Sequence, residues 1–276
     1  MKTTKILKMC LVALIIAVTM PTQMAAQCSF KNTAFKSGEF LYYNLYYNWK
    51  LVWVNAGSAS MSTVLSRYKG KPAYRTSLTT KSNSKVDKMF MLRDTLLCYI
   101  SEELEPFYYR KGAREGKRYY VDEVFYSYEG SKVNLRQHEL HNSGNHTWKN
   151  TSSNDCIYDM ISIFQRARNF DPSGWSKGQV IKIPIADGDD VKTALLKFRG
   201  KQNIKADNGV KYRCLVLSYL EKENDERDYK EIVRFFVTDD ANHIPIRLDM
   251  FLRFGSAKAF LVNMKGNKNP VTAIVK

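Results

Sequence analysis

The sequence predicts a mainly β protein that carries one amphipathic helix. Most of the chain consists of short runs rich in Tyr, Phe, Val, Leu and Thr, separated by Gly, Asn and Asp, which is typical of strands and turns. Residues 155–168 differ, because their apolar side chains recur at helical spacing. The last four predicted strands are joined by short polar links, which favours an antiparallel meander in that part of the chain.

The clearest predicted strand is 40–49, FLYYNLYYNW. Side chains alternate between the two faces of a strand, so one face here is apolar or aromatic throughout and the other is half polar. The apolar face consists of Leu41, Tyr43, Leu45, Tyr47 and Trp49. Packing into a core is the default interpretation of such a face, and the lining of an apolar cavity is the alternative.

Further strands are predicted wherever β-forming runs end at turn residues. They cover 57–67, 72–81, 89–100, 118–128, 131–138, 179–185, 192–199, 211–220, 229–238, 244–254 and 257–265. The segment 110–118, RKGAREGKR, interleaves both charges and is predicted to be a solvated hairpin loop.

The predicted helix over 155–168 has one apolar face, which we expect to lie against the sheet. Ser152 and Asp155 form an S-x-x-D pattern that resembles a capping box at its start. Gly174 ends the segment. The apolar face consists of Ile157, Met160, Ile161 and Phe164.

Residues 1–26 have the three parts of a secretory signal peptide. Three lysines and no acid precede an apolar run of 12 residues that ends at Met20, and small residues follow as far as Ala26. The run is too short for a membrane-spanning helix, which needs about 20 apolar residues. We therefore expect export to the periplasm, cleavage near Ala26, and a single β-rich domain over 27–276.

Four cysteines remain after cleavage: Cys28, Cys98, Cys156 and Cys214. An oxidising compartment permits disulfides, and four cysteines allow three pairings, all of which stay open. Cys98 and Cys214 lie in strand-like runs, where a free buried thiol is an ordinary core residue. A lipoprotein signal requires a small residue directly before the modified cysteine, and Gln27 occupies that position before Cys28. A soluble exported protein is therefore favoured over a lipoprotein.

The chain is strongly basic. Its net charge is +16, and cleavage after Ala26 removes three lysines and no acid, which leaves +13. Such a balance favours contact with anionic surfaces such as phospholipid head groups or acidic polysaccharide, and export argues against nucleic acid. The charges are scattered along the sequence, so a basic surface without a dedicated partner is the simpler interpretation.

No pattern of catalytic or metal-binding residues stands out. His138 and His141 lie in RQHELH, which lacks one residue of the H-E-x-x-H zinc spacing, and on a strand they would point to opposite faces. The sequence contains no G-x-S-x-G, no C-x-x-C and no calcium loop. We therefore predict a protein without catalytic residues, metal or cofactor.

Several short features along the chain carry a resemblance to a known family. In order they are Gly38-Glu39, Ala56-Gly57, Leu104-x-Pro106, the helix from Asp155-x-x-Tyr158-Asp159 to Arg166, Tyr212-x-Cys214, Thr238-Asp239-Asp240 and Ile244-Pro245. Their order over 35–262 resembles the uncharacterised bacterial family called domain of unknown function 3108. The resemblance implies an exported protein with a curved antiparallel sheet, or a barrel-like meander, around a packed helix. It brings no established activity. The implied shape is similar to that of periplasmic carriers that hold acyl chains in an open half-barrel.

These observations favour a non-enzymatic exported protein that binds a lipid-like or other apolar ligand. The ligand would lie between the sheet and the helix, against Tyr43, Tyr47, Trp49, Ile157, Met160, Ile161 and Phe164. The alternative is a structural or interaction protein of the cell envelope with a filled core. A continuous apolar cavity of several hundred Å³ between helix and sheet would distinguish the first function from the second.

Overall fold

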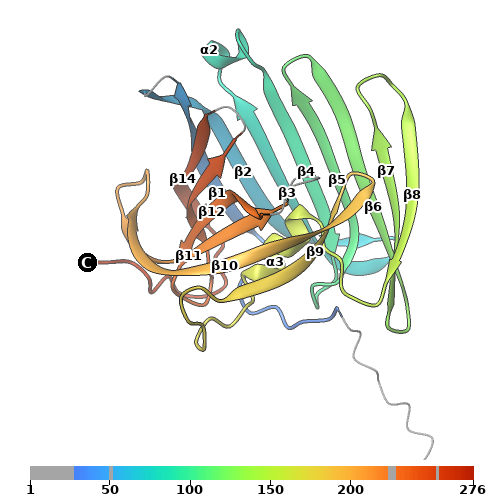
Figure 1. Ribbon diagram of the computed structural model, residues 1–276. Helices are drawn as coiled ribbons and strands as arrows, with labels where there is room; N and C mark the ends of the chain where they lie inside the picture. Colours follow the sequence, from blue (N-terminus) through green and yellow to red (C-terminus); the bar gives the residue numbers. More distant parts are fainter. Residues whose placement is uncertain (1–27, 50–51, 223–227, 253–254) are drawn as a thin grey trace, which may run out of the picture.

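The computed structural model describes residues 28–49, 52–222, 228–252 and 255–276. The predicted signal peptide, 1–26, therefore lies outside the described residues. The described chain forms one antiparallel sheet of 14 strands that curves around a short helix (Figure 1). The sheet is not closed, since β8 and β9 are its two edges.

The strands follow one another as two meanders that meet between β1 and β14. Their order across the sheet is β8-β7-β6-β5-β4-β3-β2-β1-β14-β13-β12-β11-β10-β9, so every connection except the one from β8 to β9 joins neighbours. The strands are β1 Glu39–Trp49, β2 Val52–Tyr68, β3 Lys71–Ser82, β4 Leu92–Ile100, β5 Pro106–Glu115, β6 Arg118–Glu129, β7 Lys132–Leu140, β8 His146–Ser153, β9 Val180–Asp187, β10 Asp190–Lys205, β11 Lys211–Glu221, β12 Lys230–Thr238, β13 Pro245–Phe251 and β14 Ser256–Lys265. The predicted β fold and its final meander are confirmed.

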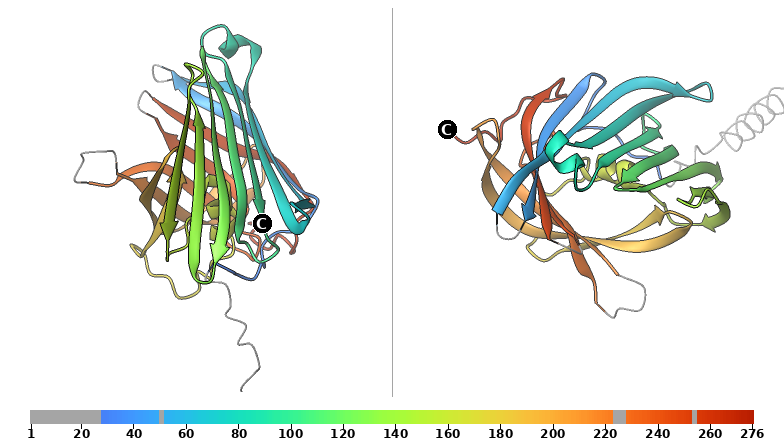
Figure 2. Two further views of the ribbon diagram at one scale, coloured as in Figure 1. Left: turned by 90° about the vertical axis from the view of Figure 1, so that its right-hand side faces the viewer. Right: turned by 90° about the horizontal axis from the view of Figure 1, so that it is seen from above.

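The long connection between the two edge strands contains the packed helix α3, Met160–Ala167. Seen from above, the sheet curls around this helix (Figure 2). The predicted amphipathic helix is thus present, but it begins later than the sequence pattern suggests. Asp159 is its N-cap, and Asp159 and Ser162 form the capping box that we assigned to Ser152 and Asp155.

The late start of α3 has a cause in the sheet. Tyr158 forms a parallel bridge with Ile185 of β9, and its backbone exchanges hydrogen bonds with Pro184 and Ala186. The residues before Met160 are therefore held in extended conformation by the edge strand, where they cannot also form a helical turn.

Two strands and one helical turn were missed in the sequence. The supposed loop 110–118 is mostly β5, whose hydrogen bonds to β4 and β6 hold charged side chains on a regular strand. β8 is an edge strand without a buried residue, so it shows no apolar periodicity. The helical turn α2, Ser84–Asp87, begins at Asn83, whose side chain accepts hydrogen bonds from two backbone amides.

The core is divided into three clusters, and α3 contributes to all of them. Ile161 packs with side chains of β4–β7, Ile163 with those of β9–β12, and Phe164 against those of β1, β2 and β11–β14. Burial of such a side chain stabilises a fold by about 1.5–3 kcal/mol. The helix therefore acts as the centre on which the curved sheet packs.

One disulfide joins the N-terminal segment to the residues that lead into α3. It links Cys28 to Cys156, across 128 residues of sequence. Cys98 and Cys214 are free and buried, which agrees with their interpretation as core residues. None of the helices in the described part of the chain has the length and apolar character needed to cross a membrane.

Candidate functional site

The predicted ligand-binding residues on β1 have different environments. Tyr43 is buried, and its hydroxyl donates a hydrogen bond of 3.0 Å to the carbonyl oxygen of Pro245. Tyr47 is half-buried. Trp49 is the last residue of β1, and its side chain lies outside the described residues.

The predicted residues on the helix are also separated. Ile157 and Ile161 are buried in the cluster of β4–β7, whereas Phe164 packs against the cluster that contains Tyr43. Met160 is 52% exposed. The structure therefore places Phe164 against the cluster to which Tyr43 belongs, but it does not unite the predicted residues into one apolar lining.

A network of buried polar groups fixes the far side of α3 to the sheet. Arg168 donates to both carboxylate oxygens of Glu39, at 2.6 and 2.8 Å, and to the carbonyl oxygen of Asn242. Gln165 donates to the hydroxyls of Thr63 and Thr76, at 3.0 Å each. Buried polar groups with satisfied partners fix an arrangement, so this region has a structural role.

Asp159 is a buried carboxylate, as catalytic acids often are. Its contacts, however, are those of a helix N-cap. It accepts hydrogen bonds from the backbone of Ile161 and Ser162 and from the hydroxyl of Tyr126. Burial raises the pKa of this carboxyl, while its hydrogen-bond donors oppose that shift. Its lone pairs are engaged by the protein itself.

A second cluster of polar side chains lines the inner face of β4–β6. Lys111 donates to the hydroxyl of Tyr120 at 2.7 Å, and Tyr120 donates to Glu115 at 2.9 Å. Burial raises the pKa of both Asp94 and Asp122 to about 6. Within the described residues, no group of three His, Cys, Asp or Glu side chains is placed to hold a metal ion.

The opposite, outer face of β2–β8 carries a continuous row of aromatic and basic side chains. Core residues such as Val124 and Leu135 point inward, so their neighbours along each strand point outward. The strand register then aligns outward residues in one row that crosses six strands. This row is Arg75, Tyr99, Tyr108, Phe125, Arg136 and Asn150.

Aromatic rings from this row and its neighbours contact one another across the strands. Tyr68 lies 5.3 Å from Tyr99 and 5.6 Å from Tyr108, measured between ring centroids. Tyr108 lies 5.1 Å from Phe125, and Phe125 lies 6.3 Å from Trp148. With strands about 4.8 Å apart, a row from β3 to β8 spans roughly 24 Å.

Cations accompany these rings. Lys69 lies 5.4 Å from the ring centre of Tyr68, and Arg136 lies 4.2 Å from that of Trp148. Lys71 lies over Phe107 in the same way. A ring attracts a cation without neutralising it, so the positive charge still acts on an anion. We call this surface the outer band, which comprises Tyr68, Tyr99, Phe107, Tyr108, Phe125, Trp148, Lys69, Lys71, Arg75, Arg110 and Arg136.

One acid, Glu123, lies among these residues and is held by its neighbours. The hydroxyl of Tyr108 donates to one of its oxygens, and the other oxygen lies 2.8 Å from Nδ1 of His138. Nε2 of His138 lies 2.8 Å from Nδ1 of His146. The ring of His138 stacks on that of Trp148, with 4.2 Å between centroids. This chain of contacts fixes the ring of Trp148 in the outer band.

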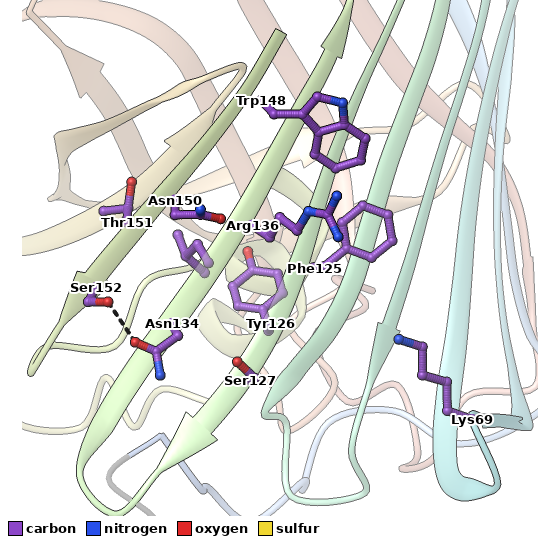
Figure 3. Close-up of a pocket in the computed structure, with 11 residues that line it drawn as sticks. Lys69, Phe125, Tyr126, Ser127, Asn134, Arg136, Trp148, Asn150, Thr151 and Ser152 are labelled. Carbon is purple, nitrogen blue, oxygen red and sulfur yellow. Dashed lines mark hydrogen bonds between the residues drawn. The ribbon is translucent and has the colours of Figure 1, made fainter. Parts of the chain in front are cut away.

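The end of the outer band at β6–β8 is hollowed. A depression of about 510 Å³ lies between Phe125, Asn134, Arg136 and Trp148, whose side chains stand on the same side of the strands (Figure 3). Its volume is in the range of small-molecule sites. A second depression, of about 360 Å³, lies near Phe30. Neither is lined by α3.

The chemistry of the outer band suits a ligand that is both anionic and rich in polarised C–H groups. The faces of the rings are electron-rich and attract such groups, while Lys and Arg attract carboxylate or sulfate. Burial raises the pKa of the Tyr68 and Tyr108 hydroxyls, so both remain protonated, but the hydroxyl of Tyr108 already donates its hydrogen to Glu123.

Little in the sequence indicates this surface. Each strand contributes only one or two of its rings, and the rings become neighbours only through the register between strands. Alternation in YYVDEVFYSY could have assigned Phe125 to the face opposite Val124. It could not have placed Phe125 beside Tyr108 and Trp148, because β5 and β8 were not predicted as strands.

Comparisons with known proteins agree with the fold. A crystal structure described as a β-barrel-like protein of domain of unknown function DUF1849 from Brucella abortus superposes with a TM-score of 0.54 at 11% sequence identity. The alignment covers 84% of this chain and 98% of the other, and at this identity it shows a shared fold alone. No curated protein matches the sequence.

The family comparison agrees with the resemblance seen in the sequence. The family described as protein of unknown function (DUF3108) matches residues 42–262, which is most of the chain. The chain therefore belongs to the DUF3108 family.

Proposed function

We propose that this chain is an exported, non-enzymatic protein of the cell envelope that binds an acidic polysaccharide on the outer band. The observation that carries the proposal is the continuous row of rings and cations across β2–β8. This function develops the predicted alternative, an interaction protein with a filled core, and adds a binding surface to it.

The shape of the outer band favours a polysaccharide over a bilayer. Tyr68, Tyr99, Tyr108 and Phe125 are half-buried, so their rings are partly open to solvent but do not project far from the sheet. A chain of sugar rings can lie along such a row and place its C–H groups on them. A bilayer instead requires apolar side chains that project far enough to enter it.

The predicted apolar ligand between helix and sheet has less support. Ile157, Ile161 and Phe164 pack against side chains of the sheet, and the two depressions described above are lined by other residues. Internal binding of a lipid-like molecule stays a prediction.

The proposed export rests on the signal pattern of residues 1–26 and on the bond between Cys28 and Cys156. Disulfides persist in oxidising compartments, of which the bacterial periplasm is one. The engaged thiol of Cys28 also supports a soluble protein rather than a lipoprotein.

The proposal is tested by titrating the mature protein with polygalacturonate and with neutral dextran in a calorimeter. We expect binding to polygalacturonate that weakens as salt is raised, because screening reduces the attraction of the cations. Phe125→Ala combined with Trp148→Ala should weaken it about tenfold or more, a loss of about 1.4 kcal/mol.

Arg136→Gln should weaken this binding too, whereas Lys205→Gln, at the turn between β10 and β11, serves as the matched control. Equal affinity for dextran, or an unaltered affinity after the double substitution, would refute the proposed function.

A further inference from the structure

Exposed apolar side chains are concentrated at one end of the sheet. Val52, Trp53 and Val54 begin β2, Met89 and Phe90 follow α2, and Tyr119 begins β6. Phe251 and Leu252 end β13. Met89 and Val52 are the most exposed of them, at 70% and 62%. We call these eight residues the apolar rim.

The strand directions explain why these segments meet. In an antiparallel meander, alternate connections lie at the same end of the sheet. The connections β1–β2, β3–β4, β5–β6 and β13–β14 therefore share the end at which α2 lies (Figure 1). Figure 2 shows the same end from above.

Contacts between the connections hold parts of the apolar rim in place. The ring of Phe90 lies against Gly116 of the β5–β6 turn, where an added Cβ would be 3.2 Å from it, and the amide of Gly116 donates to the carbonyl oxygen of Met91. Nζ of Lys258 lies 4.1 Å from the ring centre of Trp53. These exposed side chains therefore belong to an ordered surface.

The surroundings of the apolar rim are basic. Lys81, Lys85, Lys88 and Lys117 are exposed beside it. The acids nearest to these lysines are engaged: Asp87 with Arg93 at 2.5 Å, and Glu115 with Arg118 at 3.3 Å. Apolar side chains surrounded by lysines match an anionic bilayer surface, where the former enter the interface and the latter meet head-group phosphates.

We propose that the apolar rim docks this protein on membranes that contain anionic phospholipid. Charge complementarity identifies the bilayer as the occupant, since a neutral apolar partner would gain nothing from the lysines. The apolar rim is separate from the outer band, so this proposal is tested independently of the proposed polysaccharide binding.

The test is co-sedimentation of the mature protein with vesicles of phosphatidylcholine alone or with about one-third phosphatidylglycerol. We expect the protein to pellet with the anionic vesicles and to leave the neutral ones largely unbound. Met89→Ser with Phe90→Ser should weaken binding about tenfold or more, because two buried apolar contacts are lost. Leu65→Ser, at a residue that is 54% exposed in β2 away from the rim, should not alter it.

Charge is tested with a second pair of variants. Lys85→Glu with Lys88→Glu should weaken binding to anionic vesicles about tenfold or more. Lys205→Glu with Lys211→Glu makes the same change of charge at the opposite end and should have a much smaller effect.

Thermal unfolding establishes that each variant is folded. The inference is overturned if the wild-type protein ignores anionic vesicles, or if folded rim variants bind as well as wild type. It is also overturned if sedimentation velocity shows that the apolar rim is covered by a second copy of the chain.

Discussion

Removal of the buried guanidinium at Arg168 should destabilise the fold more than any surface substitution. Arg168 and Glu39 are 2% and 1% exposed, and two hydrogen bonds join them. Arg168→Met leaves the carboxylate of Glu39 buried and unpaired, which typically costs 3–5 kcal/mol in the free energy of unfolding. The same substitution also removes the hydrogen bonds to the carbonyl oxygen of Asn242.

Urea unfolding followed by circular dichroism measures this loss. Adding Glu39→Gln to Arg168→Met should recover about half of it or more, because a neutral amide costs less to bury than an unpaired carboxylate. Lys192→Met, which breaks an exposed pair with Asp187, should cost less than about 1 kcal/mol. A loss below about 1 kcal/mol for Arg168→Met would refute the view that the polar network fixes α3 to the sheet.

Three further outcomes are expected. Cys156→Ser should lower the free energy of unfolding by up to about 5 kcal/mol, from the entropy of the 128-residue loop, and unfolding with and without reductant checks this. Asp122→Asn should be more stable than wild type at pH 8, with the difference disappearing below about pH 4. The folded pKa of about 6 lies above the value of 3.8 for an exposed carboxyl, so ionisation penalises the fold only as pH rises through that interval; an unchanged difference in unfolding midpoint between pH 8 and pH 4 would contradict it. Ile161→Ala should cost about 2–5 kcal/mol through the cavity it leaves beside β4–β7, and a cost below about 1 kcal/mol would mean that α3 is dispensable to the core.

Much of the fold could be predicted because burial leaves a periodic mark on the sequence. The strand at 40–49 and the helix around Ile161 were identified from their alternating and helical apolar patterns. β8 could not be, because none of its residues is buried and its sequence therefore shows no apolar face. The start of α3 was misplaced because Tyr158 pairs with β9, a tertiary contact that local pattern does not contain.

The candidate site could not be predicted either, because it is formed by tertiary contacts. Phe125 and Trp148 are far apart in sequence and meet only when β6, β7 and β8 take their register. The disulfide between Cys28 and Cys156 likewise depends on a tertiary contact, that of the N-terminal segment with the residues before α3. By contrast, the burial of Cys98 and Cys214 could be expected from their strand-like runs, although the pairing of the four cysteines stayed open.

The most direct test of the account is to map where polygalacturonate binds, by hydrogen–deuterium exchange on the mature protein. We expect the ligand to slow exchange in β5–β8, in peptides that contain Tyr108, Phe125 and Trp148. We expect α3 and the rim segments outside β6, such as 52–54 and 89–90, to keep their exchange rates. Slowed exchange confined to α3 and β1, with β5–β8 unaltered, would contradict this expectation and would place the ligand inside the curved sheet.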